Sequence, residues 1–206
     1  MEKYFAGEEF TTEEIQSALR ENVKQCNIAP ILMGSGIHVQ GFNVLLQVID
    51  KYFPSPKELE AIGVDASTGE HFTAHYNDEA TISGRVWKTI ADPFLGKYSL
   101  FKICTGVLKA NSEVYNVNKE ATEIGKLYIL RGNTPIEVPE LKSGDLGAVA
   151  KLSITETGDS IAVRNAPIIY HAPKISTPYT YMAYTAENKA DEDKLSTALQ
   201  RMMEED

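Results

Sequence analysis

The chain has 206 residues, of which 43% are hydrophobic and 24% charged, and its formal net charge is -9. This length supplies apolar material for one or two ordinary domains and excludes a large enzyme. No apolar run approaches the roughly 20 residues that a membrane helix needs, and Met1–Lys3 do not open a signal peptide, so we expect a cytoplasmic protein without membrane contact.

The chain begins with the signals of a helix. Thr11 and Glu14 form a capping-box pattern, and apolar residues then recur at helical spacing from Ile15 to Val23. A short apolar run at 28–33 is typical of a buried strand, because it is brief and ends in Gly34-Ser35-Gly36.

A second amphipathic helix is predicted from Phe42 to Phe53, stopped by Pro54-Ser55-Pro56. A strand that is apolar on both faces needs helices to cover it, so residues 1–56 have the pattern of a parallel α/β sheet. One strand cannot make that sheet. We therefore expect these residues to be the remnant of a domain whose other strands are not in this chain.

Residues 57–79 are polar and contain Gly63 and Gly69, which predicts an irregular connector. From Thr81 onward, apolar residues recur at every second position. Six short strands separated by turn signals favour a closed all-β barrel over residues 80–172. The predicted strands are 81–89, 98–104, 113–117, 123–130, 146–152 and 160–163.

The remaining residues, 173–206, change character again. A strand is predicted at 179–185, and Leu195, Leu199 and Met202 mark one face of a helix that ends on three acids without a glycine cap. This pattern predicts the strand-helix start of an α+β domain that is incomplete here.

The acidic balance is unevenly distributed. Residues 1–79 carry a net charge of -8 and residues 171–206 carry -3, whereas residues 80–170 carry +2. Because phosphate contact depends mainly on Lys and Arg, the middle segment is the part of the chain that favours a nucleic-acid partner.

Several runs in this order resemble the elongation factor G family of translational GTPases. PILMGSGIHVQGFNVLLQVIDKYFPSP (30–56) resembles the end of its GTPase domain. WKTIADPFLGKYSLFKICTGVLK (87–109), SGDLGAVAKL (143–152) and TGDS (157–160) resemble its second domain, and the final run ENKADEDKLSTALQRMMEED resembles the start of its third.

The resemblance implies a parent protein that binds GTP and magnesium, hydrolyses GTP and drives tRNA and mRNA movement on the ribosome. We expect this chain to be a non-catalytic fragment, because no GxxxxGK[ST] phosphate loop occurs in it. It would then hold no cofactor or metal and have no catalytic residue. Two alternatives stay open: a ribosome-protection paralogue of the same family, and a free-standing β-barrel adaptor that binds RNA or protein.

The resemblance also implies where contacts lie. Ser35, Gly36 and Ile37 stand where the family has a guanine-facing loop, although we favour an ordinary turn for this chain. The second domain packs on the GTPase domain and touches small-subunit ribosomal RNA. Cations cluster around its first two strands, and we take five as RNA-contact candidates or, equally, as a solvated rim: Arg85, Lys88, Lys97, Lys102 and Lys109.

Metal and thiol chemistry have little support. Cys26 and Cys104 lack any zinc spacing, and His71 and His75 could share a helical face only if the connector were helical. Apolar faces that the absent sheet would cover favour self-association, which we interpret as a consequence of truncation.

Overall fold

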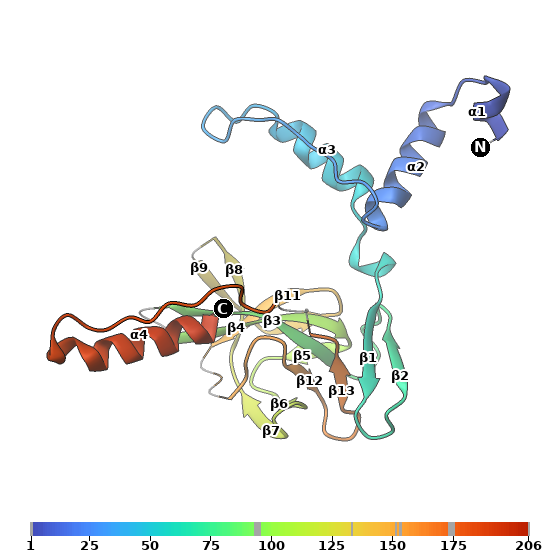
Figure 1. Cartoon of the computed structure of the whole chain (residues 1–206). Helices are drawn as coiled ribbons and strands as arrows, with labels where there is room; N and C mark the ends of the chain where they lie inside the picture. The colour runs from blue at the N-terminus through green and yellow to red at the C-terminus, as the bar shows by residue number, and fades with distance from the viewer. Residues whose placement is uncertain are drawn as a thin grey trace. The chain divides into compact units, whose positions relative to one another are not determined.

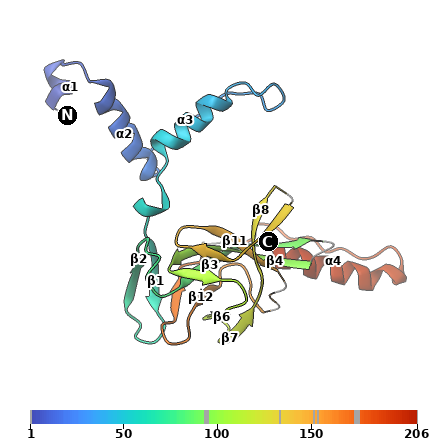
Figure 2. The ribbon, with the colours of Figure 1, turned by 180° about the vertical axis from the view of Figure 1, so that it is seen from behind.

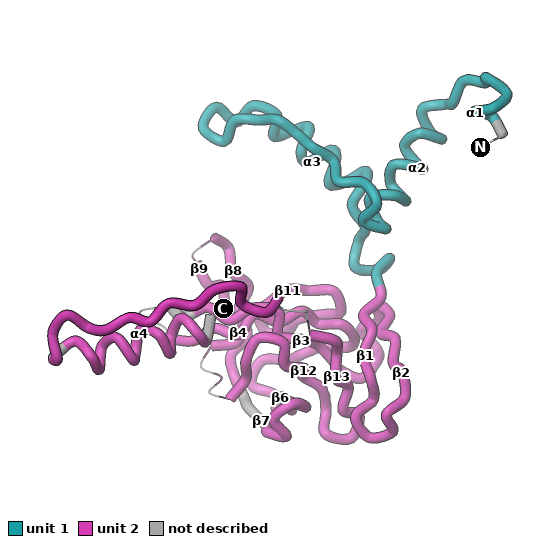
Figure 3. The backbone as a smooth tube through the Cα atoms, viewed as in Figure 1, with its two compact units in different colours: residues 1–59 teal, residues 60–206 magenta. Residues whose placement is uncertain are grey.

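The computed structural model describes residues 2–92, 96–132, 134–150, 152, 154–172 and 176–205. The chain divides into two compact units, Met1–Leu59 and Glu60–Asp206 (Figure 3). Within the described residues no helix is long and apolar enough to cross a membrane.

The first unit is helical. It contains α1 (Glu2–Ala6), α2 (Thr12–Lys24), α3 (Phe42–Tyr52) and the 3-10 turn η1 (Pro56–Glu58). The capping box forms as the sequence indicates: the Glu14 amide donates to Thr11 Oγ1 at 3.3 Å, and the Thr11 amide donates to Glu14 Oε2 at 2.9 Å. These reciprocal bonds give two backbone donors a local partner and fix where α2 begins.

The strand predicted at 28–33 does not form. These residues have no regular structure, and Ile31 and Met33 are 92% and 93% exposed. A strand is stabilised by the ladder beside it, and this unit supplies no partner strand among its described residues. The α/β expectation for residues 1–56 is therefore wrong in its strand and right in its two helices.

Arg20 of α2 fixes the end of this unit. Its Nη1 donates to the Lys51 carbonyl oxygen at 2.9 Å, and its Nη2 donates to both carboxylate oxygens of Glu58, at 2.7 and 2.9 Å. The guanidinium fork thus holds a terminal carbonyl of α3 together with the turn that follows it. The Ser55 amide adds a bond to Glu58 Oε2 at 2.9 Å.

The second unit is mainly β, as predicted, and its strands pair antiparallel (Figure 1). The strands are β1 (Ala61–Asp65), β2 (His71–Ala74), β3 (Ser83–Asp92), β4 (Gly96–Thr105), β5 (Val107–Lys109), β6 (Glu113–Asn116), β7 (Ala121–Ile124), β8 (Leu127–Arg131), β9 (Thr134–Val138), β10 (Glu140–Lys142), β11 (Leu146–Ala150), β12 (Ser160–Ala162) and β13 (Ile168–Tyr170).

Eight of these strands form one sheet in the order β7-β6-β12-β3-β4-β11-β8-β9. Among the described residues no pairing returns from β9 to β7, so the closed barrel that we predicted is not found. The two-stranded ribbon β5–β10 instead covers the main core: Leu108 and Leu141 of the ribbon pack with Phe101 and Ile103 of the sheet. Coverage by the ribbon removes this face from water without ring closure.

The predicted connector is not irregular. Its residues form the hairpin β1–β2, and β13 pairs on the other side of β1 to give a three-stranded sheet; these strands lie side by side in both views (Figures 1 and 2). Asp65 Oδ1 accepts bonds from the Ser67 and Thr68 amides and so makes the hairpin turn. The polar composition concealed a pair of strands.

Two further predicted strands differ from the structure. The strand predicted at 123–130 is split into β7 and β8 at Gly125, where a Cβ would overlap Val149. The strand predicted at 179–185 is absent: the segment is irregular and Tyr181 is 96% exposed. The final helix is present as α4 (Glu192–Glu205), preceded by the 3-10 turn η2 (Lys189–Asp191).

The Arg20 contact predicts an unusual titration of Glu58. Arg20, followed by the Ser55 amide, lowers the pKa of Glu58 from 4.5 to about 2. The depressed pKa means that this contribution to stability is complete above about pH 4.5 and is lost as the pH falls toward 2. A carboxyl-carbon NMR titration should give a midpoint near 2, and Arg20→Gln should raise it toward 4.5.

Lys3→Gln is the control, because it removes the partner of Glu14 and leaves Glu58 untouched. A midpoint for Glu58 near 4.5 in the unmodified chain would contradict the contact.

The covering role of the ribbon predicts a large cost for truncating it. Leu141 is 0% exposed, so Leu141→Ala should lower the free energy of unfolding in urea by about 2–5 kcal/mol. Ile136→Ala is the matched control, since Ile136 on β9 is 41% exposed and should cost much less. Equal losses for the two variants would show that the ribbon does not cover the core.

Candidate functional site

The cationic candidates are positioned by the long pairing of β3 with β4. In its register Arg85 is directly opposite Lys102, and Lys88 is opposite Leu100. Residues directly opposite in an antiparallel pair project to the same side, and positions two apart along a strand do likewise. Arg85, Lys102 and Lys88 therefore share one face, which we call the β3–β4 cationic face.

The other two candidates lie elsewhere. Lys97 is an odd number of residues from Leu100 and Lys102 along a regular stretch of β4, so it projects to the opposite face. Lys109 is on the ribbon, directly opposite Glu140 of β10. The five residues that the sequence groups together thus divide into a set of three and two separate residues.

The cationic face borders a buried cluster between two sheets. Cys104 and Tyr170 are buried there with Ala74 and Ile168. The Tyr170 hydroxyl and the Ser83 hydroxyl lie 2.5 Å apart, which joins β13 to β3. Burial raises the pKa of the Cys104 thiol, and burial likewise raises the pKa of the Tyr170 hydroxyl, so both stay uncharged beside Arg85.

Charges on the cationic face are not neutralised by the described part of the chain. None of its carboxylates lies within 4.0 Å of the charged nitrogens of Arg85, Lys88 or Lys102, whereas Lys119 and Lys126 each have such a partner. The buried Nε of Arg85 also has no hydrogen-bond partner there. Two cations placed opposite each other without a counter-charge repel, and an anion would relieve that repulsion.

Lys97 faces a different electrostatic environment. The pKa of Glu156 is lowered, chiefly by its hydrogen bond with Lys119 at 2.8 Å and in smaller part by Lys97. Asp159 of the same loop accepts a bond from Asn116 Nδ2 at 2.9 Å, which ties the loop to β6. Glu156 therefore offsets the charge of Lys97, which makes Lys97 the weaker candidate for an anion contact.

The predicted guanine-loop residues form a closed turn. The Ser35 amide donates to the Gln40 carbonyl at 3.0 Å, the Gln40 amide returns a bond to Ser35 at 3.1 Å, and the His38 amide donates to Ser35 Oγ at 3.2 Å. Gly36 and Ile37 lie inside this turn, and Ile37 is 91% exposed. The Ser35 amide is thus already engaged, which favours the ordinary turn that we expected.

The sequence also contains the letters Asn-Lys-x-Asp, a guanine-recognition pattern of GTPases, at Asn188–Asp191. Here Lys189–Asp191 form η2 immediately before α4, with Asn188 at the N-cap position, and the Asp191 carboxylate accepts a bond from Lys194 at 2.8 Å. They follow an irregular segment and not a buried strand, so they form a helix start in this chain.

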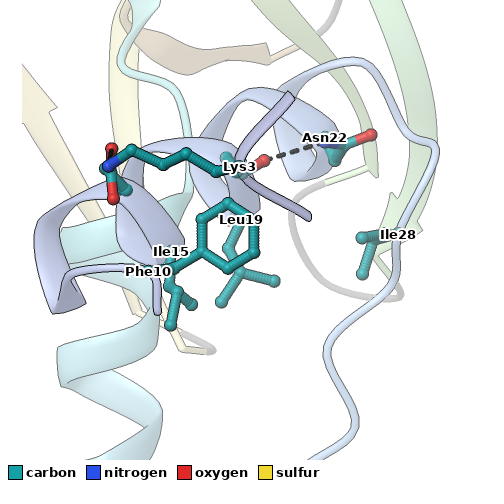
Figure 4. A pocket seen from close by; sticks show the side chains of 8 residues that line it. Lys3, Phe10, Ile15, Leu19, Asn22 and Ile28 are labelled. Atoms are coloured by element: carbon teal, nitrogen blue, oxygen red, sulfur yellow. Dashed lines mark hydrogen bonds and ion pairs between the residues drawn. The ribbon is translucent and has the colours of Figure 1, made fainter. Parts of the chain in front are cut away.

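The helical unit has an apolar pocket. Phe10, Ile15, Leu19 and Ile28 line a cavity of about 790 Å³ on one side of α2 (Figure 4). Ile15 remains 50% exposed, and Leu45 and Ile49 of α3 are 39% and 45% exposed. The unit thus leaves apolar helix faces uncovered, and the self-association expected from them stays a prediction.

Metal ligation finds no support in the described residues, where no group of three His, Cys, Asp or Glu converges. His71 lies on β2 and His75 lies 3.4 Å from Glu60, so the helical His pair is absent. Pro93–Leu95, which belong to the run 87–109 that resembles the second domain, lie outside the described residues.

Sequence reasoning missed Trp87. The register of β3 with β4 passes from Val86 to Lys88, so Trp87 forms a β-bulge beside the cationic face. Its position between cationic residues, as the only tryptophan of the chain, was the available signal.

Comparison with known proteins agrees with this architecture. Residues 81–164, which contain the β3–β4 pairing, match the sequence model of elongation factor G domain 2. A crystal structure of a protein from Thermus thermophilus has the same fold, with a TM-score of 0.60 and 24% sequence identity. The match covers 100% of this chain and 29% of that chain.

Residues 81–164 are therefore similar to the second domain of elongation factor G, a translation factor. The sequence resemblance predicted this second domain in the same part of the chain. It spans less than a third of the Thermus thermophilus protein that it matches.

Proposed function

We propose that this chain is the non-catalytic part of an elongation-factor-G-like GTPase, and that its second domain contacts RNA of the small ribosomal subunit. The observation that carries the proposal is the β3–β4 cationic face, which lies within the matched segment. Three cations without described counter-charges on one sheet face suit a polyanion. The parent's GTP hydrolysis would drive tRNA and mRNA movement, in the cytoplasm.

In this proposal, GTP binding and hydrolysis take place in other parts of the parent protein. The residues of this chain do not fit GTP and magnesium: there is no phosphate loop, and the Ser35 amide bonds to Gln40. The role of this chain would then be to bind and orient the factor on the subunit.

Isothermal calorimetry tests the non-catalytic assignment. Titration of GTP with magnesium into the chain should give no saturable heat, because nothing in the sequence can cradle the triphosphate. ATP serves as the control for non-specific heat. A dissociation constant for GTP in the micromolar range would overturn the assignment.

Co-sedimentation with small ribosomal subunits tests the RNA contact. Lys88→Gln with Lys102→Gln removes two cations of one face, whereas Lys97→Gln with Lys109→Gln removes the same charge from two other places. The first pair should weaken binding and reduce the slope of log K against log salt by about 2, roughly one for each phosphate that is no longer neutralised.

The second pair should leave that slope nearly unchanged. Equal effects of the two pairs would mean that only net charge matters, and would contradict a contact through the cationic face.

A further inference from the structure

The bulge in β3 presents an aromatic side chain to solvent. Trp87 has no register partner in β4, and it is 43% exposed. Its neighbours on the same strand, Val86 and Thr89, are each 1% exposed. A bulge re-aims a side chain that regular pairing would have packed, and burying a tryptophan is otherwise strongly favourable. The exposed ring is therefore a feature that a binding role would explain.

Cations adjoin this ring. Lys88 is the next residue, and Arg85 and Lys102 continue the cationic face along the same pair of strands. Lys102 and the position opposite Lys88 are two residues apart on β4, a separation of about 7 Å. Positive charges on the β3–β4 pair thus repeat along the strand direction. Their interval is comparable to the distance between successive phosphate groups of a nucleic acid.

An exposed ring beside cations favours some classes of binding partner over others. A protein surface docking on Trp87 would favour a wholly apolar surround, whereas the strand pair that carries Trp87 also carries Arg85, Lys88 and Lys102. None of these cations has a described carboxylate within 4.0 Å. Single-stranded nucleic acids are bound by such a combination, in which an aromatic ring stacks on a base and cations follow the backbone. A duplex keeps its bases stacked inside and offers the ring nothing comparable.

We propose that Trp87 is a base-stacking site for one unpaired nucleotide of RNA, with Lys88 and Lys102 contacting the adjoining phosphates. This inference rests on the proposed RNA contact and adds the unpaired base as its target. Trp87 supplies stacking area at the bulge, and the two lysines fix the direction in which the strand leaves the ring.

The fluorescence of Trp87 tests the site directly, because it is the only tryptophan in the chain. Titration with a ten-nucleotide single-stranded oligouridylate at low salt should quench that emission saturably. An RNA duplex of equal length should not quench it. Absence of quenching under conditions where labelled oligouridylate binds by anisotropy would overturn the proposal, and so would absence of any binding.

Variants separate stacking from charge. Trp87→Leu should weaken oligouridylate binding about fivefold or more, the loss expected for one stacked base, and Trp87→Phe should retain most of the affinity. Tyr184→Leu is the matched control, since Tyr184 is an exposed aromatic in the irregular tail. Equal affinities for Trp87→Leu and the unmodified chain would contradict stacking.

Failure of the stacking site can be distinguished from failure of the proposed RNA contact. Subunit co-sedimentation that depends on Lys88 and Lys102, together with an inert Trp87, would remove the stacking site and leave the RNA contact intact. Loss of both would remove the RNA contact itself.

Discussion

The antiparallel pairing of β3 with β4 is the interaction on which the second unit depends. It is the longest ladder in the described residues, and both of its faces are used. On one side Phe101 and Ile103 meet the β5–β10 ribbon; on the other side Tyr98 and Leu100 form a second cluster with Ala148. Strict alternation along β4 assigns each residue to one of these faces.

That alternation determines which charged residues can act together. A one-residue change of register would send Lys102 into the core in place of Phe101, at a large free-energy cost. The core therefore fixes the positions of the cations as firmly as it fixes its own side chains. The bulge at Trp87 places an exposed ring beside the cationic face.

Much of the secondary structure of both units was predictable because its signals are local. Alternating apolar residues located β3, β4, β6, β11 and β12, and the Thr11–Glu14 capping box located α2. Elements that depend on distant partners were not predictable. The polar hairpin β1–β2 is completed by β13 roughly 100 residues away, and the apolar run at 28–33 stays irregular without a ladder beside it.

The candidate site likewise has features that local sequence signals predict and features that depend on distant pairing. Composition identified the cations of the middle segment, but only the register separates Lys97 and Lys109 from the other three. Similarly, the glycine-containing segment at 34–36 forms the ordinary turn that its residues favour, yet the bonds between Ser35 and Gln40 depend on backbone geometry that no residue pattern specifies.

The central claim is that one face of the β3–β4 pairing meets ribosomal RNA. Amide NMR perturbation mapping, with RNA isolated from the small subunit added to the labelled chain, tests it most directly. We predict shifts concentrated at Arg85, Trp87, Lys88 and Lys102, with Lys97 and Lys109 unaffected. Shifts centred on Lys97 and Lys109, or spread evenly over all cations of the chain, would contradict it.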